Sequence, residues 1–160
     1  MMRTLAAAAI ALTLALSQTA IAAPDVKTAC EALVIDYAYY RDRGESDAFA
    51  NLFTEDAHLE VLGEVWTGRA AIKARLDTAP EATPLLRHHM TTIRITPESE
   101  DRASGVSYAT IYAGPPGAAP PLPATSFAAV GEYHDQFVRT AAGWKIARRV
   151  FVPVFMPPTP

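Results

Sequence analysis

The sequence has a single cysteine, and it lacks the short motifs that identify many hydrolases and nucleotide-binding enzymes. With Cys30 alone, neither an internal disulfide nor a zinc site built mainly from thiolates can form. There is no G-x-S-x-G nucleophile motif, no phosphate-binding P-loop and no H-E-x-x-H zinc motif. Basic residues form no run, and the formal net charge is −3, so nucleic acid is not an expected partner.

The longest apolar run lies at the N-terminus, and it is shorter than a membrane-spanning helix requires. Leu5 to Leu16 follow a basic start at Arg3, and Ala20 to Ala22 fit the small-residue rule for cleavage. A bilayer needs roughly 20 apolar residues. We therefore expect residues 1–22 to be a cleaved secretory signal peptide rather than an anchoring helix. The mature chain, residues 23–160, would then be periplasmic or secreted, with no further attachment to a membrane.

The rest of the chain predicts helices first and strands afterwards. Apolar residues recur at helical spacing from Val26 to Tyr40, and Gly44 ends this helix. Shorter helices are expected around Phe49 and Ile72, with short strands between them. From Pro84 onwards the alternation is that of strands, and the last two form a hairpin across the sequence TAAG.

Helices followed by strands predict a single α+β domain. We expect its core at about residues 27–152, with helices packed on one face of a strongly curved mixed or antiparallel sheet. The segment 114–125 holds five prolines and is expected to be a long loop, because proline lacks the N–H that a central strand or helix needs.

Five stretches, in this order, resemble the SnoaL-like group of the nuclear-transport-factor-2-like superfamily. They are Tyr37-Ala38 with DRG, DAFANLFTEDA, TGRAAIKARL, RHHMTT and GEYHDQFVRTAAGWKIARR. The resemblance implies a cone fold, in which a curved sheet encloses an apolar pocket closed by the first helix. It also implies a homodimer formed through the outer face of the sheet.

Similarity to two enzymes of this superfamily implies candidate site residues. Compared with scytalone dehydratase, Asp42 and His89 match catalytic positions. Compared with ketosteroid isomerase, Tyr37 and Asp135 match the groups that hold the substrate oxygen. The water-activating tyrosine of the first enzyme and the general base of the second both fall on Val61, and the second histidine of the dehydratase has no histidine counterpart here.

The adjacent histidines His88 and His89 must point to opposite faces of their strand. If His89 faces the pocket, as the resemblance implies, then Arg87, Thr91 and Ile93 share its side. We expect His89 to be the acid–base residue with Asp42 as its partner. Imidazole suits this role because it exchanges protons near neutral pH. A core histidine with a purely structural hydrogen bond to Asp42 is the alternative.

Further polar side chains are expected around the substrate. Tyr112 shares one strand face with Tyr108, and both are predicted to line the pocket. Tyr133 shares a face with Asp135, which would bind substrate or, alternatively, pair with Arg148 or Arg149 on the next strand. A metal site is not expected, because adjacent histidines of a regular strand cannot both bind one ion.

These residues lead to a functional hypothesis and one alternative. The hypothesis is an exported lyase or isomerase, similar to a dehydratase or ketosteroid isomerase and needing no cofactor. It would carry out acid–base elimination, hydration or isomerisation of a small apolar molecule that contains oxygen. The alternative is an exported module of the same fold that binds a small ligand or a partner without chemistry.

Overall fold

The protein is described by a computed structural model, which covers residues 25–77, 84–123 and 127–158. The expected signal peptide, residues 1–22, and part of the proline-rich segment lie outside these ranges. No helix of the described part is long and apolar enough to span a membrane.

In the described residues, three helices precede most of the sheet, as the sequence predicts. Helix α1 is Val26–Arg43, α2 is Ser46–Asn51 and α3 is Arg69–Ala74. The side chain of Asp25 accepts hydrogen bonds from the first N–H groups of α1. Gly44 ends that helix in the left-handed conformation, at φ 69°, which glycine adopts without steric cost.

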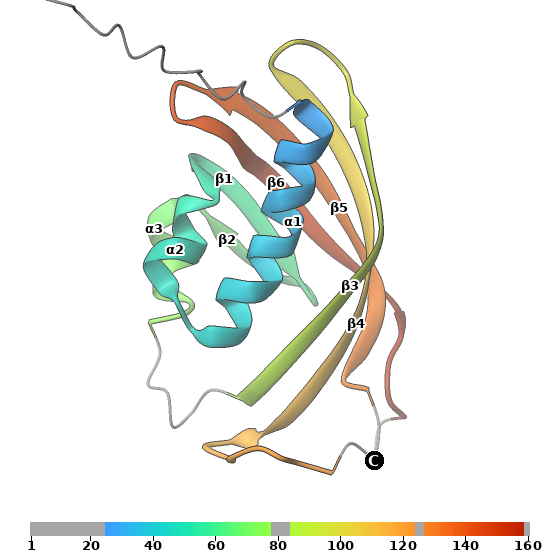
Figure 1. Cartoon of the computed structure of the whole chain (residues 1–160). Helices are drawn as coiled ribbons and strands as arrows, with labels where there is room; N and C mark the ends of the chain where they lie inside the picture. Colours follow the sequence, from blue (N-terminus) through green and yellow to red (C-terminus); the bar gives the residue numbers. More distant parts are fainter. Residues whose placement is uncertain (1–24, 78–83, 124–126, 159–160) are drawn as a thin grey trace, which may run out of the picture.

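Within the part of the chain that the structure describes, six strands form one mixed sheet in the order β2-β1-β6-β5-β4-β3. Their bounds are Phe53–Val61 for β1, Glu64–Thr67 for β2, Pro84–Pro97 for β3, Arg102–Pro116 for β4, Ala129–Thr140 for β5 and Gly143–Phe155 for β6. Only the pair β1 and β6 is parallel. The sheet is strongly curved, and the helices lie on one side of it (Figure 1).

Strand β4 runs further than the sequence suggested. It reaches Pro116, so residues 114–116 of the expected loop belong to the strand, with Pro84 opposite Pro116. Both prolines stand at strand ends on the edge pair β3 and β4, where a missing N–H removes no central hydrogen bond.

The core fills the space between the helices and the inner face of the sheet. Aromatic and aliphatic side chains of both layers are almost completely buried there: Cys30, Val34, Tyr37, Phe49, Phe53, Leu59, Ile72, Tyr133, Phe137, Ile146 and Phe151. Six strands covered by helices on one face agree with the expected α+β cone.

An irregularity in β3 decides which of its side chains face the helices. Thr91 lies opposite Tyr108 and Arg94 lies opposite Val106, so three steps along β3 match two along β4. Thr92 has a positive φ of 48° at this point. The extra residue is a β-bulge, which reverses the alternation of side chains along the strand.

Candidate active site: Asp42 and His88

Asp42, in the last turn of α1, binds His88 of β3 through both carboxylate oxygens. Oδ1 lies 2.5 Å from the ring Nδ1 of His88, and Oδ2 accepts the backbone N–H of the same residue at 2.8 Å. The His88 side chain is 5 % exposed and that of Asp42 is 10 % exposed. The aspartate therefore fixes both the backbone and the ring of one histidine.

The expected partner, His89, points the other way. It is exposed, and its ring lies 5.5 Å from that of Tyr112, another exposed residue. The expectation that His89 faces Asp42 is wrong, and so is the expectation that His89 shares a side with Ile93, because the bulge lies between these two residues. On the near side of the bulge the helix-facing positions are Leu86, His88 and Met90.

The ionised form of Asp42 is favoured by its surroundings. Burial would raise the pKa of this carboxyl group, but hydrogen bonds from the His88 ring and backbone, the charge of that ring and the charge of Arg87 outweigh it. The pKa of Asp42 is lowered as a result. A carboxylate that stays ionised can hold the His88 ring in one orientation and stabilise its protonated form.

A second carboxylate, Asp135, lies deeper in the fold. It accepts two hydrogen bonds from Arg149 of the neighbouring strand, each 2.7 Å long, and neither side chain is exposed. The two residues are opposite each other in the β5–β6 ladder. The alternative interpretation of Asp135 as a cross-strand ion pair is thus confirmed, with Arg149 as the partner.

Tyr37 and Tyr133 enclose the guanidinium group of Arg149. Its Cζ lies 4.1 Å from the centre of the Tyr37 ring and 4.7 Å from that of Tyr133. Burial raises the pKa of the Tyr133 hydroxyl well above its ordinary value, with a further contribution from Tyr37. Tyr133 is therefore neutral and can donate a hydrogen bond, and Tyr37 packs beside it.

Tyr37 also connects the two carboxylate pairs. Its ring meets that of His88 edge-to-face, with 6.3 Å between the ring centres. Of the residues expected to bind substrate, the structure thus gathers Tyr37, Tyr133 and Asp135 around Arg149, next to His88.

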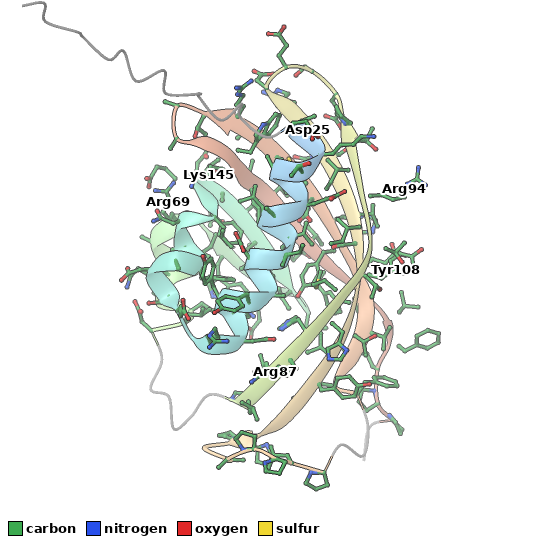
Figure 2. The ribbon with its side chains drawn as sticks, viewed as in Figure 1. Asp25, Arg69, Arg87, Arg94, Tyr108 and Lys145 are labelled. Atoms are coloured by element: carbon green, nitrogen blue, oxygen red, sulfur yellow. The ribbon has the colours of Figure 1, made fainter. Side chains whose placement is uncertain are left out.

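Tyr112 and Tyr108 lie elsewhere. Both are exposed, because the inward positions of β4 are Ala103, Gly105, Ser107, Ala109 and Ile111. Figure 2 shows Tyr108 pointing away from the helices. The prediction that these two tyrosines line the pocket is wrong, since aromatic character alone did not identify the inward face.

Sequence reasoning missed His88 as the inward histidine, although a signal for it was present. Leu86 and Met90, two positions on either side of His88, are apolar, whereas Arg87 and Thr91, at the same spacing from His89, are polar. Local alternation before the bulge would therefore have selected His88. Across the described ranges, no group of three or more His, Cys, Asp or Glu side chains is placed to hold a metal ion.

Residues 25–150 match the SnoaL-like domain family. The chain belongs to that family. No curated protein matches its sequence. This SnoaL-like chain is similar in structure to a protein of Novosphingobium aromaticivorans provisionally titled a scytalone dehydratase, with a TM-score of 0.68 and 26 % identity over 80 % of this chain and 83 % of that one.

Two further structures show the same fold. Rv3472, a protein of unknown function from Mycobacterium tuberculosis, has 24 % identity and a TM-score of 0.67 over 81 % of this chain and 72 % of its own. LinA has 15 % identity and a TM-score of 0.67 over 83 % of this chain and 88 % of its own. An NTF2-like protein with a cystatin-like fold from Novosphingobium aromaticivorans is similar in structure as well, with a TM-score of 0.66.

Proposed function

We propose that this SnoaL-like domain is an acid–base enzyme that needs no cofactor. It would catalyse elimination, hydration or isomerisation of a small, mainly apolar molecule that contains oxygen. His88 moves the proton and Asp42 positions it. The observation that carries this proposal is the nearly buried pair of Asp42 and His88, with 2.5 Å between Oδ1 and Nδ1.

The contacts of Asp42 assign a role to each nitrogen of His88. The ionised carboxylate accepts the proton of Nδ1, so the lone pair of the neutral ring stands on Nε2. Nε2 then takes a proton from the substrate and later returns it to a leaving oxygen or to another carbon. A positioned acid–base group of this kind contributes roughly 10²–10⁴-fold to the rate.

Similarity to the protein titled a scytalone dehydratase supports elimination of water as the first reaction to test. A panel of hydroxylated phenolic, terpenoid and steroid-like compounds would be incubated with the protein in D₂O and followed by NMR. Elimination, hydration and isomerisation all change the carbon-bound proton signals, so one readout covers the three reactions.

The adjacent histidines supply a matched pair of variants. We expect His88→Ala to lower turnover by about 10²-fold or more, while His89→Ala, one residue away on the exposed face, keeps nearly full activity. Equal activity of both variants would contradict the assignment of His88.

A binding module without chemistry is the second candidate, and Val61 is the observation that favours it. Val61 is an apolar residue that packs against the core, at the position where the resemblance places the general base. The two functions differ in Asp42→Asn: an enzyme would lose kcat far more than ligand affinity, whereas a binding module would lose affinity alone.

We also propose that two copies pair through the outer face of the sheet, opposite the helices. A hollow of about 500 Å³ lies there, and Val106, His134, Arg148, Val150 and Val152 contribute to its lining. Nearby apolar side chains are exposed, among them Val154 and Phe155. Sedimentation equilibrium should give a dimer, which Val152→Asp should separate; a monomer at micromolar concentration would contradict this.

Export is a further proposal, carried by residues 1–22 alone. We expect cleavage after Ala22, so N-terminal sequencing of the protein recovered from the periplasm or the medium should begin at Ala23. An intact N-terminus in a cytoplasmic fraction would contradict export.

A further inference from the structure

Two arginines at helix ends, Arg41 next to Asp42 and Arg75 after α3, have no acidic partner among the described residues. Arg41 immediately precedes Asp42 in the last turn of α1, and Arg75 is the C-terminal cap of α3. Both are half-buried. Neither forms an ion pair with any Asp or Glu of residues 25–77, 84–123 or 127–158.

The guanidinium group of Arg75 is held in place but is not saturated. Its Cζ lies 4.2 Å from the centre of the Trp66 ring. Its Nη1 is buried and has no hydrogen-bond partner in the described part of the chain. A buried donor without an acceptor is costly, so this nitrogen favours an oxygen supplied from outside the chain.

Arg41 and Arg75 are near enough for the charge of one to act on the other. Burial is the main cause that lowers the pKa of Arg41, and the charge of Arg75 lowers it further. The hydroxyl groups of Tyr37 and Tyr133 and the carboxylate of Asp42 act in the opposite direction. The charge of Arg75 also acts on Tyr133, so both arginines lie near this tyrosine, which packs against Arg149.

The charges around these tyrosines do not balance. Arg41, Arg75 and Arg149 are cations, whereas Asp42 binds the histidine and Asp135 is bound by Arg149. The carbonyl groups at the end of α1 offset part of the charge of Arg41. The same effect is small for Arg75, because α3 has only six residues. A single bound negative charge would therefore neutralise the excess positive charge of these side chains.

We propose that Arg41 and Arg75 bind a carboxylate group of the substrate, next to the Asp42–His88 pair. The planar guanidinium group matches a carboxylate with two parallel hydrogen bonds, and the Trp66 ring supplies an apolar surface beside it. The substrate class is then a small organic acid with a hydrophobic body. That the bound acid is a substrate rests on the proposed function, whereas the presence of a carboxylate-binding site does not.

Benzoate and benzamide test this site, because they differ in charge and hardly in shape. Protein labelled with ¹⁵N-arginine would be titrated with each compound at millimolar concentrations, and the Nε–H signals would be followed by NMR. We expect benzoate to shift the signals of Arg41 and Arg75 and to bind at least about tenfold more tightly than benzamide. Equal affinities, or no shift of either arginine signal with benzoate, would overturn the proposal.

Three substitutions make the result specific. Arg41→Met and Arg75→Met should each abolish the preference for benzoate. If Arg75→Met does not fold because it loses the Trp66 contact, Arg75→Lys replaces it, and this variant should retain part of the preference. Arg94→Met is the matched control, since Arg94 points away from the helices (Figure 2). A preference that survives both site substitutions would overturn the proposal.

His88→Ala separates this inference from the proposed function. It should keep the preference for benzoate while it loses turnover. If it keeps both, the catalytic role of His88 is wrong and the carboxylate site stands. If it loses the preference although the Arg41 and Arg75 signals remain in place, the carboxylate binds elsewhere and this inference fails.

Discussion

Asp42 and Asp135 are both paired carboxylates on the helix side of the sheet, yet their surroundings differ. Asp135 and Arg149 are fully buried and stand opposite each other in a regular ladder, between two tyrosine rings. Asp42 joins the end of a helix to a strand, and its partner keeps a second ring nitrogen that Asp42 does not engage. The difference separates an interior ion pair from a pair that can exchange a proton.

The comparison also predicts different consequences when each aspartate is replaced. Removing one partner of a fully buried pair leaves a charge without compensation, whereas a histidine can lose its charge. We therefore expect Asp135 to matter mainly for stability and Asp42 mainly for rate.

The largest effect on stability is expected for Asp135→Asn. It leaves the guanidinium group of Arg149 buried without its carboxylate, which should cost about 3–5 kcal/mol in the free energy of unfolding. Urea denaturation followed by circular dichroism measures it. The double variant Asp135→Asn with Arg149→Met should recover part of the loss; a single variant as stable as the wild type would remove the distinction between the two pairs.

Asp42→Asn should have a smaller effect on stability, of about 1–3 kcal/mol, because the amide can still accept one of the two hydrogen bonds. Its effect on kcat should exceed that on KM, since an amide does not stabilise a protonated His88. Denaturation and steady-state kinetics on the same preparation would check both. A stability loss as large as that of Asp135→Asn would contradict the assignment of roles.

The pH dependence of stability sharpens the comparison. The pKa of Asp42 in the folded protein lies below its ordinary value of 3.8, so the unfolded chain binds this proton more readily. The stabilisation is fully present above the unfolded pKa and is lost as the pH falls through the folded one. Asp42→Asn should therefore lose less stability than the wild type as the pH falls. An equal decrease of the free energy of unfolding in both proteins at acid pH would contradict this.

The smallest effect concerns Cys30, close to the deeper pair. Burial, with a further contribution from the charge of Asp135, raises the pKa of its thiol to about 12. We expect no reaction with a thiol-specific reagent in native protein at neutral pH and rapid reaction in urea. Reaction of the native protein at the rate of a free thiol would show that this region opens.

The fold could be predicted from the sequence because helical spacing, strand alternation and the hairpin sequence all repeat over many residues. An ion pair of Asp135 with Arg148 or Arg149 was expected only as an alternative to substrate binding, since opposite charges on neighbouring strands fit a regular register; the structure selects Arg149. The choice of His89 over His88 followed the resemblance and failed, and one extra residue near Thr92 places His89 and Ile93 on opposite faces of the strand. A bulge of that kind depends on the partner strand and leaves no periodic signal.

Arg41 and Arg75 could not be recognised from the sequence for a related reason. They stand at the ends of different helices, and only the packed fold brings both near Tyr133. Each alone looks like an ordinary cation at a helix end.

The proton position on His88 tests the central claim most directly and needs no substrate. Long-range ¹H–¹⁵N correlation spectra would be recorded at a pH where the histidine rings are neutral, with His88 assigned by comparison with His88→Gln. The account expects the proton of His88 on Nδ1 and its lone pair on Nε2, and a change in this form in Asp42→Asn. A proton fixed on Nε2, or a spectrum that Asp42→Asn leaves unchanged, would contradict it.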